Sequence, residues 1–245
     1  MESAKRRLIY TLLKLGLPVD NKTRDPVNGL AFAFLEDKRV NPYVEAELVL
    51  TGHADGLITV NLAEADDVKR EQTRQHFGER QRTLLGHFRH ESGHYYYDRL
   101  VKNTQHHQAF RNIFGDDTIN YEAALSSYYH QMPKHNSHAN YISAYAQAHP
   151  LEDWAESWAH YLHIVDTLET AKEFQMTESA GNLQDIDAWL DDWVDVSVAL
   201  NALNRSMGLQ DAYPFVYTAK IIEKLHFVHQ VIYPSWRPRQ LAAVV

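Results

Sequence analysis

The sequence predicts a helix-rich α+β fold with a small N-terminal sheet and a helical C-terminal lobe. Short apolar runs rich in β-branched and aromatic residues lie between residues 29 and 62, and their spacing is typical of strands. Later segments instead place apolar residues at helical spacing. With 245 residues, of which 44% are hydrophobic, the chain can bury a substantial core.

The composition excludes several kinds of partner and chemistry. The formal net charge is −8 and no long basic run occurs, so neither nucleic acid nor an anionic membrane surface is expected as the main partner. The chain contains no Cys, which excludes disulfides and cysteine-ligated zinc. No stretch approaches the roughly 20 apolar residues that span a bilayer, and Lys14 interrupts the N-terminal apolar run that superficially suggests a secretory signal. A cytoplasmic location is the default prediction, and the oligomeric state is left open.

The N-terminal segment is predicted to form an amphipathic helix followed by a small sheet. The apolar positions with helical spacing are Leu8, Leu12, Leu13 and Leu15. Gly16 and Pro18 form a stop signal for this helix. Strands are then expected at residues 29–35, 48–50 and 56–62, and residues 52–56 are expected to form the turn before the last strand. Leu30, Phe32 and Phe34 are expected on one face of the first strand.

The rest of the chain is predicted to be mainly helical. The expected helices cover residues 84–98, 121–131, 151–165, 186–207 and 217–231, with Pro150 in the first turn of the third and Gly208 after the fourth. Residues 63–77 are expected to be a solvated charged helix, and residues 101–108 and 132–137 to be connections. We expect one domain over residues 1–245, in which a site lies in a cleft between an N-terminal lobe of about residues 1–102 and a helical lobe of about residues 103–245.

The helix expected at residues 84–98 contains His90-Glu91-Ser92-Gly93-His94, the H-E-x-x-H spacing of zinc hydrolases. Residues four apart on a helix share a face, so His90 and His94 can bind one metal ion from the same side. Glu91 lies one step round the helix, where its carboxylate can reach a metal-bound water without ligating the metal. Apolar neighbours make the other sides suitable for burial, namely Leu84, Leu85, Phe88, Tyr95 and Tyr96.

An accidental match is the alternative interpretation, because the chain contains 15 His and a comparable number of Glu. Gly93 argues against it. A Gly inside a helix costs about 1 kcal/mol relative to Ala. Gly93 therefore fits the close approach of another segment better than it fits a generic surface helix.

A catalytic zinc takes three protein ligands and one open position, so a third ligand must come from another segment. Leu100 stands six residues after His94, which excludes the longer metzincin motif. Glu152 and Glu156 are four apart on a later helix, so one can ligate the metal while the other holds the second ring nitrogen of a ligand histidine. Spacing leaves open which of the two glutamates ligates the metal. Glu152 lies near the helix start, which favours it as the ligand and leaves the supporting role to Glu156.

Other assignments also remain open at this point. Both glutamates could be solvated surface carboxylates. Four other residues are weaker candidates for the third ligand, and we expect them to be capping, core or supporting groups instead: His149, Asp153, His160 and His163. Asp98, one turn after His94, is expected to be structural.

Four segments carry a family resemblance: TGHADGLITVNLAEAD at 51–66, RTLLGHFRHESGHYYYDRL at 82–100, HPLEDWAESWAHYLH at 149–163 and LNALNRSMG at 200–208. In combination they are specific, and the chain resembles the bacterial zinc-binding metallopeptidases. That family is usually described with a zinc ribbon ahead of the peptidase-like domain. The resemblance implies a zincin-like metallopeptidase fold. A chain without Cys cannot build the ribbon, so we expect either a trimmed form or a variant without it.

The Glu-x-x-x-Glu arrangement also resembles gluzincins of the anthrax lethal factor type, in which the first Glu ligates zinc and the second supports the site. Those enzymes carry a Tyr seven residues before the ligand Glu, and Tyr145 stands at that position here. The resemblance implies that Tyr145 hydrogen-bonds the oxyanion formed in the reaction. Tyr141 is the fallback for this role.

Together these residues predict a zinc metallopeptidase with one Zn²⁺ per chain, held by His90, His94 and Glu152. Glu91 would take a proton from the zinc-activated water and return it to the leaving amine. The expected substrate is a peptide or protein. An extended peptide could pair with the strand at residues 56–62 if that strand forms an exposed edge of the sheet. The alternatives are a zinc-binding or scaffold protein without turnover and a zinc hydrolase acting on a non-peptide amide.

Overall fold

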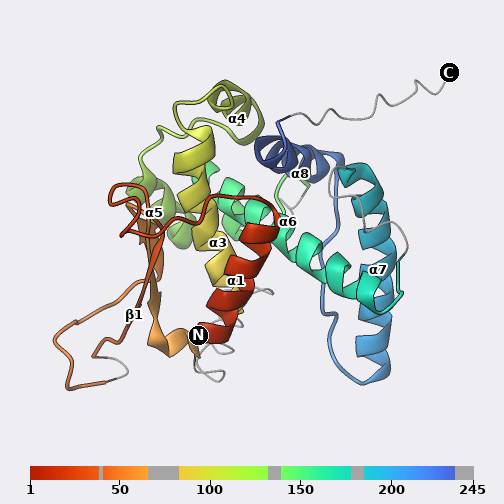
Figure 1. Cartoon of the computed structure of the whole chain (residues 1–245), viewed down its shortest axis with the longest axis horizontal. Helices are drawn as coiled ribbons and strands as arrows, with labels where there is room; N and C mark the ends of the chain where they lie inside the picture. Colours follow the sequence, from red (N-terminus) through yellow and green to blue (C-terminus); the bar gives the residue numbers. More distant parts are fainter. Residues whose placement is uncertain (39–40, 66–82, 132–138, 178–184, 235–245) are drawn as a thin grey trace.

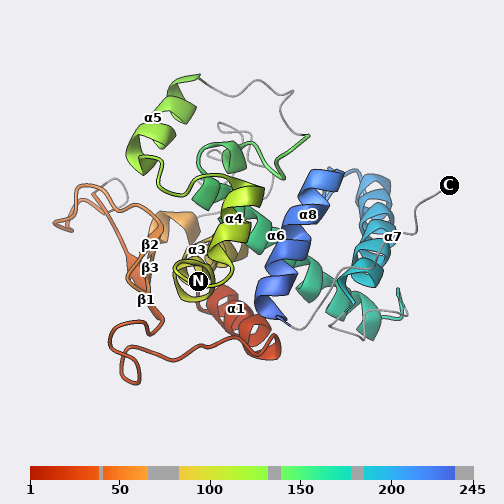
Figure 2. The same cartoon turned by 90° about the horizontal axis from the view of Figure 1, so that it is seen from above.

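The computed structural model describes residues 1–38, 41–65, 83–131, 139–177 and 185–234. Most of these residues are helical, and a three-stranded sheet lies at one side of the molecule. Helices α7 (Ile186–Ser206) and α8 (Ala219–Ile232) lie at the opposite side, and α3 (Leu84–Tyr96) and α6 (Pro150–Glu173) run between the two sides (Figures 1 and 2). The predicted helix-rich α+β class with a small sheet is confirmed.

The first helix, α1 (Glu2–Lys14), forms where the leucine spacing predicts it. Leu8 and Leu12 are completely buried in the core. Leu13 is 58% exposed, so it does not belong to the buried stripe as expected. After the helix, Gly16 adopts a φ of +68°, a left-handed conformation that Gly reaches without a Cβ penalty.

The sheet consists of β1 (Ala31–Leu35), β2 (Gly52–Ala54) and β3 (Leu57–Asn61) in the order β1-β3-β2. β3 runs parallel to β1 and antiparallel to β2. Asp55 and Gly56 join β2 to β3 with φ values of 47° and 80°, which match the two-residue hairpin turn that favours Asp-Gly. The predicted strand at 56–62 is confirmed, but residues 52–54 form a strand where the sequence predicted part of a turn.

The expected strand at residues 48–50 is wrong, because the main chain there bonds to side chains instead of a ladder. The Val49 amide donates to a carboxylate oxygen of buried Asp37 at 3.0 Å. The Asn61 side-chain amide donates to the Val49 carbonyl at 2.9 Å and to Asp37 at 2.7 Å. These side-chain hydrogen bonds give the segment an alternative to sheet pairing.

The active-site helix of the prediction is α3, which continues into a π-helical turn at Tyr97–Val101. Thr83 caps its start, because its side-chain oxygen accepts from the Gly86 amide at 2.9 Å. Phe88 packs edge-on against Phe32 and Phe34 of β1, with ring centroids 5.8 and 6.0 Å apart. The sheet therefore covers one face of α3, and the face predicted for β1 is the one in contact.

The C-terminal half contains α4 (His107–Phe114), α5 (Tyr121–Gln131), the short 3-10 helix η4 (Tyr145–Gln147), α6, α7 and α8. The sequence predicted α5 to α8 but not α4. In α4 only Phe110 and Phe114 are buried, and the mostly polar residues around them give a weak apolar pattern. His149 caps α6, and Pro150 occupies the first turn as expected. The predicted loop at 132–137 and most of the charged segment at 63–77 lie outside the described residues, apart from a short 3-10 helix, η1, at Leu62–Ala65.

Helices α3 and α6 cross closely at the centre of the fold (Figure 1). A Cβ built on Gly93 would meet Ala155 and Trp158, which confirms the close approach expected at this glycine. Trp154 donates its indole N–H to the Gly93 carbonyl at 2.8 Å, and Trp158 donates to Ser92 Oγ at 3.0 Å. None of the helices in the described part of the chain combines the length and apolar composition that crossing a membrane requires.

Candidate metal centre

The α3–α6 crossing brings three possible metal ligands together. Nε2 of His90 lies 3.2 Å from Nε2 of His94 and 3.0 Å from Oε2 of Glu152. His94 Nε2 lies 3.4 Å from Oε1 of the same carboxylate. The two imidazoles are four residues apart on α3, and Glu152 belongs to the first turn of α6. Among the described residues, His90, His94 and Glu152 form a cluster whose ligand atoms lie within 4.8 Å of one another.

This donor set fits zinc on geometric and chemical grounds. Zinc bonds of about 2.0–2.2 Å in a tetrahedron place neighbouring ligand atoms roughly 3.3–3.5 Å apart, close to the separations at this cluster. Two imidazoles and one carboxylate are also a common ligand set of catalytic zinc sites. Glu152 is completely buried, whereas the His90 and His94 side chains are 12% and 17% exposed, so the cluster is reached from the histidine side.

The second ring nitrogen of His90 is held by Glu156, whose Oε1 lies 2.7 Å from Nδ1. A carboxylate at this nitrogen fixes the ring orientation and leaves Nε2 for a metal ion. Burial lowers the pKa of His90, but hydrogen bonds with Glu152 and Glu156 outweigh this and hold the pKa well above its ordinary value. The carboxylates around His90 therefore favour positive charge at this position, which a bound metal ion also supplies.

Burial raises the pKa of Glu152, but the charge of His94 and hydrogen bonds with His90 and His94 lower it further, to well below the ordinary value. Glu156 behaves in the same way, since His90 offsets the effect of burial and the pKa ends below the ordinary value. Both glutamates that the sequence singled out are therefore ionised here, and they have different places. Glu152 belongs to the cluster, whereas Glu156 lies behind His90.

Glu91 is 8% exposed and lies on the same turn of α3 as His90. Burial raises the pKa of its carboxyl, His90 and His94 lower it, and Glu152 and Glu156 raise it again. The net shift is upward. A carboxylate with a raised pKa is a better proton acceptor near neutral pH than an exposed one.

Two tyrosines contact this centre from other segments. The Tyr145 ring, on η4, has its centroid 5.8 Å from that of His90, and burial raises the pKa of its phenol. Tyr121, the first residue of α5, donates its hydroxyl to Oε1 of Glu152 at 2.6 Å. The sequence singled out Tyr145 but not Tyr121, because nothing in the local sequence distinguishes Tyr121 from the other 13 tyrosines.

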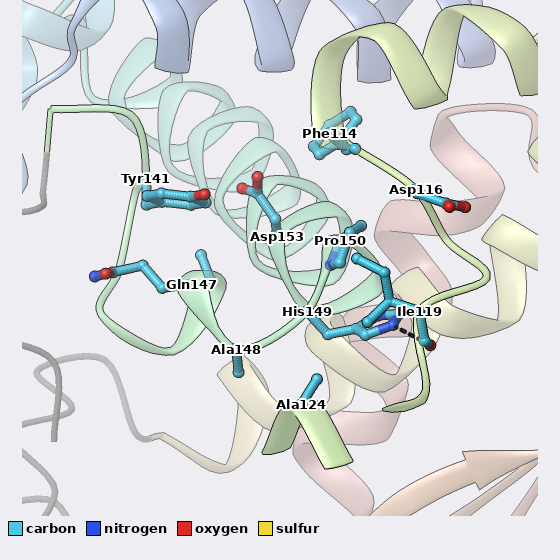
Figure 3. A pocket seen from close by; sticks show the side chains of 12 residues that line it. Phe114, Asp116, Ile119, Ala124, Tyr141, Gln147, Ala148, His149, Pro150 and Asp153 are labelled. Atoms are coloured by element: carbon cyan, nitrogen blue, oxygen red, sulfur yellow. Dashed lines mark hydrogen bonds between the residues drawn. The ribbon is translucent and has the colours of Figure 1, made fainter. Parts of the chain in front are cut away.

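A pocket of about 320 Å³ lies beside the start of α6, and Tyr141, His149 and Asp153 are among the residues that line it (Figure 3). Asp153 is 1% exposed and pairs with buried Lys224 at 2.6 Å. Burial raises the pKa of Asp153 to about 7 despite this partner. The Tyr141 ring lies under the Lys224 ammonium, 4.4 Å from its centroid. Asp153 and Tyr141 therefore belong to this pocket and not to the metal cluster.

The remaining candidates have structural partners. His149 Nδ1 accepts from the Leu151 amide at 3.1 Å, which makes it the cap of α6. His160 hydrogen-bonds the Tyr213 hydroxyl, and His163 Nδ1 lies 3.1 Å from Arg89. Asp98 is exposed and lies 3.3 Å from Lys102. These roles agree with the capping, core and structural assignments expected for them.

Comparison with known proteins assigns the chain to a family. Residues 1–231 match the profile of the family described as "Putative zinc-binding metallo-peptidase". The chain belongs to this family. An uncharacterized protein of Mycobacterium tuberculosis (strain ATCC 25618 / H37Rv) and one of Mycobacterium bovis are each 43% identical to it over 239 residues. Each match covers 94% of this chain and 68% of the relative. No solved structure matches the chain significantly.

Membership in this metallopeptidase family agrees with the resemblance found in the sequence. The family description names zinc, and the cluster of His90, His94 and Glu152 fits that metal. Because the matched region extends from α1 through most of α8, it includes every element that contributes to the cluster.

Proposed function

We propose that this chain is a zinc metallopeptidase of the gluzincin type with a zincin-like fold. His90, His94 and Glu152 would hold one zinc ion. The observation that carries the proposal is the cluster itself, in which two histidines of an H-E-x-x-H helix meet a buried glutamate of a second helix. A bound zinc ion activates water and polarises a carbonyl oxygen, which is the chemistry that peptide hydrolysis requires.

Glu91 is the proposed general base. It takes a proton from the attacking water and returns it to the nitrogen of the leaving amine. Its burial and the upward shift of its pKa support this role, because a carboxylate with a raised pKa is a stronger proton acceptor. Its position one residue after His90 keeps it beside the cluster without making it a ligand.

Tyr145 is the proposed donor to the oxyanion that develops on the attacked carbonyl. Its phenol has a raised pKa and therefore keeps its proton, which a hydrogen-bond donor must do. Glu156 holds the Nδ1 side of His90 and so keeps Nε2 directed at the cluster.

A peptide or protein remains the proposed substrate, but the strand that pairs with it must differ from the predicted strand at residues 56–62. β3 is the central strand of the sheet, paired with β1 on one side and β2 on the other, so it offers no free edge along the paired residues. β1 and β2 are both edge strands, and the main chain of β2 lies nearer to α3, so we propose β2 for any strand-like pairing. The predicted cytoplasmic location, and the predicted absence of nucleic-acid and membrane partners, stay predictions.

Zinc content and turnover test the proposal together. Elemental analysis of the purified whole chain should give about one zinc, which His90→Ala and Glu152→Ala should each abolish. The wild type should then cleave members of a broad peptide library, and Glu91→Gln should keep its zinc and lose cleavage. A wild-type protein that binds no zinc, even after zinc is resupplied, contradicts the metallopeptidase proposal.

The second candidate is a zinc-binding or scaffold protein of the same fold without turnover. It is favoured if the wild type holds stoichiometric zinc but cleaves no peptide in the library. Release of an amine from small non-peptide amides, in a Glu91-dependent way, would favour the third candidate, a zinc amidohydrolase.

A further inference from the structure

Tyr121 makes a direct hydrogen bond to a proposed zinc ligand. Its hydroxyl donates to Oε1 of Glu152 at 2.6 Å, a short bond of the charge-assisted kind. A phenol keeps its proton at neutral pH, so Tyr121 can act as this donor. Tyr121 comes from α5, which lies at the periphery of the molecule (Figure 2).

The two oxygens of Glu152 therefore have different partners. Oε2 lies 3.0 Å from His90 Nε2, whereas Oε1 lies 3.4 Å from His94 Nε2 and accepts the hydrogen bond of Tyr121. A carboxylate can bind a metal through one oxygen or through both, and a strong donor on one oxygen favours binding through the other. Glu152 is completely buried, so water has little access to replace the phenol as donor.

The position of Tyr121 is fixed by the cap of α6. The Tyr121 ring packs edge-on against the His149 ring, with centroids 5.2 Å apart. His149 Nδ1 accepts from the Leu151 amide, so Nε2 carries the proton and donates to the Ile119 carbonyl at 3.0 Å (Figure 3). Ile119 precedes Tyr121 by two residues. His149 thus ties the segment before α5 to the helix that carries Glu152.

We propose that Tyr121 is a positioning residue that holds the Glu152 carboxylate in place for metal binding. This inference rests on the metal site of the proposed function. Tyr121 raises zinc affinity by fixing the rotamer of this ligand, and it takes no part in proton transfer.

Zinc affinity of the whole chain, measured by competition with a chromophoric chelator, tests this role. Tyr121→Phe should weaken zinc binding by about 10-fold or more, the usual effect of losing a partner of a metal ligand. Tyr10→Phe is the matched control, because Tyr10 also donates to a carboxylate, Glu169, at 2.6 Å but lies on the exposed surface of α1. It should leave zinc affinity unchanged. Melting of the metal-free proteins should show that both variants are folded.

The absorption spectrum of the Co²⁺-substituted protein gives a second readout. Tyr121→Phe should change the intensity of the visible bands, which report coordination number, whereas Tyr10→Phe should reproduce the wild-type spectrum. Wild-type affinity and spectrum in Tyr121→Phe would overturn the role of Tyr121 and leave the metallopeptidase proposal intact if Glu152→Ala still loses zinc. Absence of zinc binding in the wild type would overturn both proposals.

Discussion

Gly93 of α3 lies so close to Ala155 of α6 that a Cβ on Gly93 would be 2.9 Å from the Ala155 Cα. Gly93 stands between the two histidines of the motif, and Ala155 follows Glu152 by three residues. The separation of these two backbones therefore sets the distance between the histidine ligands and the glutamate. The same crossing buries the two tryptophans of α6 against α3.

Gly93→Ala should destabilise the fold and weaken the metal centre. The added methyl group overlaps main-chain and Cβ atoms of α6, so the helices must move apart. Overpacking of this kind costs about 1–3 kcal/mol in free energy of unfolding. Urea unfolding and zinc content of the variant should both be reduced. Gly52→Ala is the control, because no atom lies within 4 Å of a Cβ built there. Equal effects of the two substitutions would contradict the importance of the crossing.

Glu156→Gln should weaken zinc binding and leave the protein folded. Gln keeps the shape of the side chain but removes the charge that faces His90 Nδ1 at 2.7 Å. Loss of such a partner typically reduces metal affinity by about 10- to 100-fold. Chelator competition measures the change, and Glu223→Gln, on the exposed surface of α8, provides the control. Unchanged affinity in Glu156→Gln would show that this carboxylate does not orient the ligand.

Tyr145→Phe should reduce kcat of the peptidase reaction by about 10²–10³-fold, the typical effect of removing one oxyanion donor. Zinc content should stay at the wild-type level, because Tyr145 contacts the His90 ring and is not a ligand. Tyr141→Phe separates the two tyrosines that the sequence left as candidates. It should leave kcat nearly unchanged, because Tyr141 lies under Lys224 in the neighbouring pocket. A larger loss in Tyr141→Phe than in Tyr145→Phe would reverse the assignment.

Acidification should destabilise the fold partly through His163. Burial and the nearby charge of Arg89 lower the pKa of His163 from 6.5 to about 3, so the ring is neutral in the folded protein. An unfolded chain takes up a proton near pH 6.5, so the stabilisation is complete above this pH and is lost as the pH falls toward about 3. Between pH 7 and pH 5 this contributes a decrease of roughly 1–2 kcal/mol.

Urea unfolding of wild type and His163→Gln at these two pH values measures that contribution. The difference in free energy of unfolding between pH 7 and pH 5 should be smaller in the variant. His130→Gln is the control, because His130 lies on the exposed surface of α5. An identical pH dependence in wild type and His163→Gln would contradict the assignment.

Local patterns in the sequence were sufficient for most of the helices and for two of the three candidate metal ligands. Leucine spacing and a stop signal locate α1, and Pro150 and Gly208 lie next to real helix ends. His90 and His94 share a face because they are four apart on one helix, which no tertiary contact needs to arrange. Gly93 could also be interpreted in advance, since a Gly in a helix interior requires a reason.

The errors in the sheet have a common cause. The expected strand at 48–50 and the missed strand β2 both depend on which backbone groups find partners across the chain. Val49 bonds to Asp37 and Asn61, each 12 residues away, so its apolar sequence did not decide its conformation. Likewise α4 depends on Phe110 and Phe114 packing against aromatic rings such as Phe227 of α8.

The sequence by itself therefore determined the class of the fold, the helix that carries His90 and His94, and the two glutamates that could complete the candidate site. Only the tertiary structure placed Glu152 in the cluster, Glu156 behind His90 and Tyr121 on Glu152. The physical reason is how far apart the contacting residues lie along the sequence. Helical spacing fixes which side chains share a face of one helix, whereas contacts between residues 62, 66 and 31 positions apart depend on where two helices cross and where a third begins.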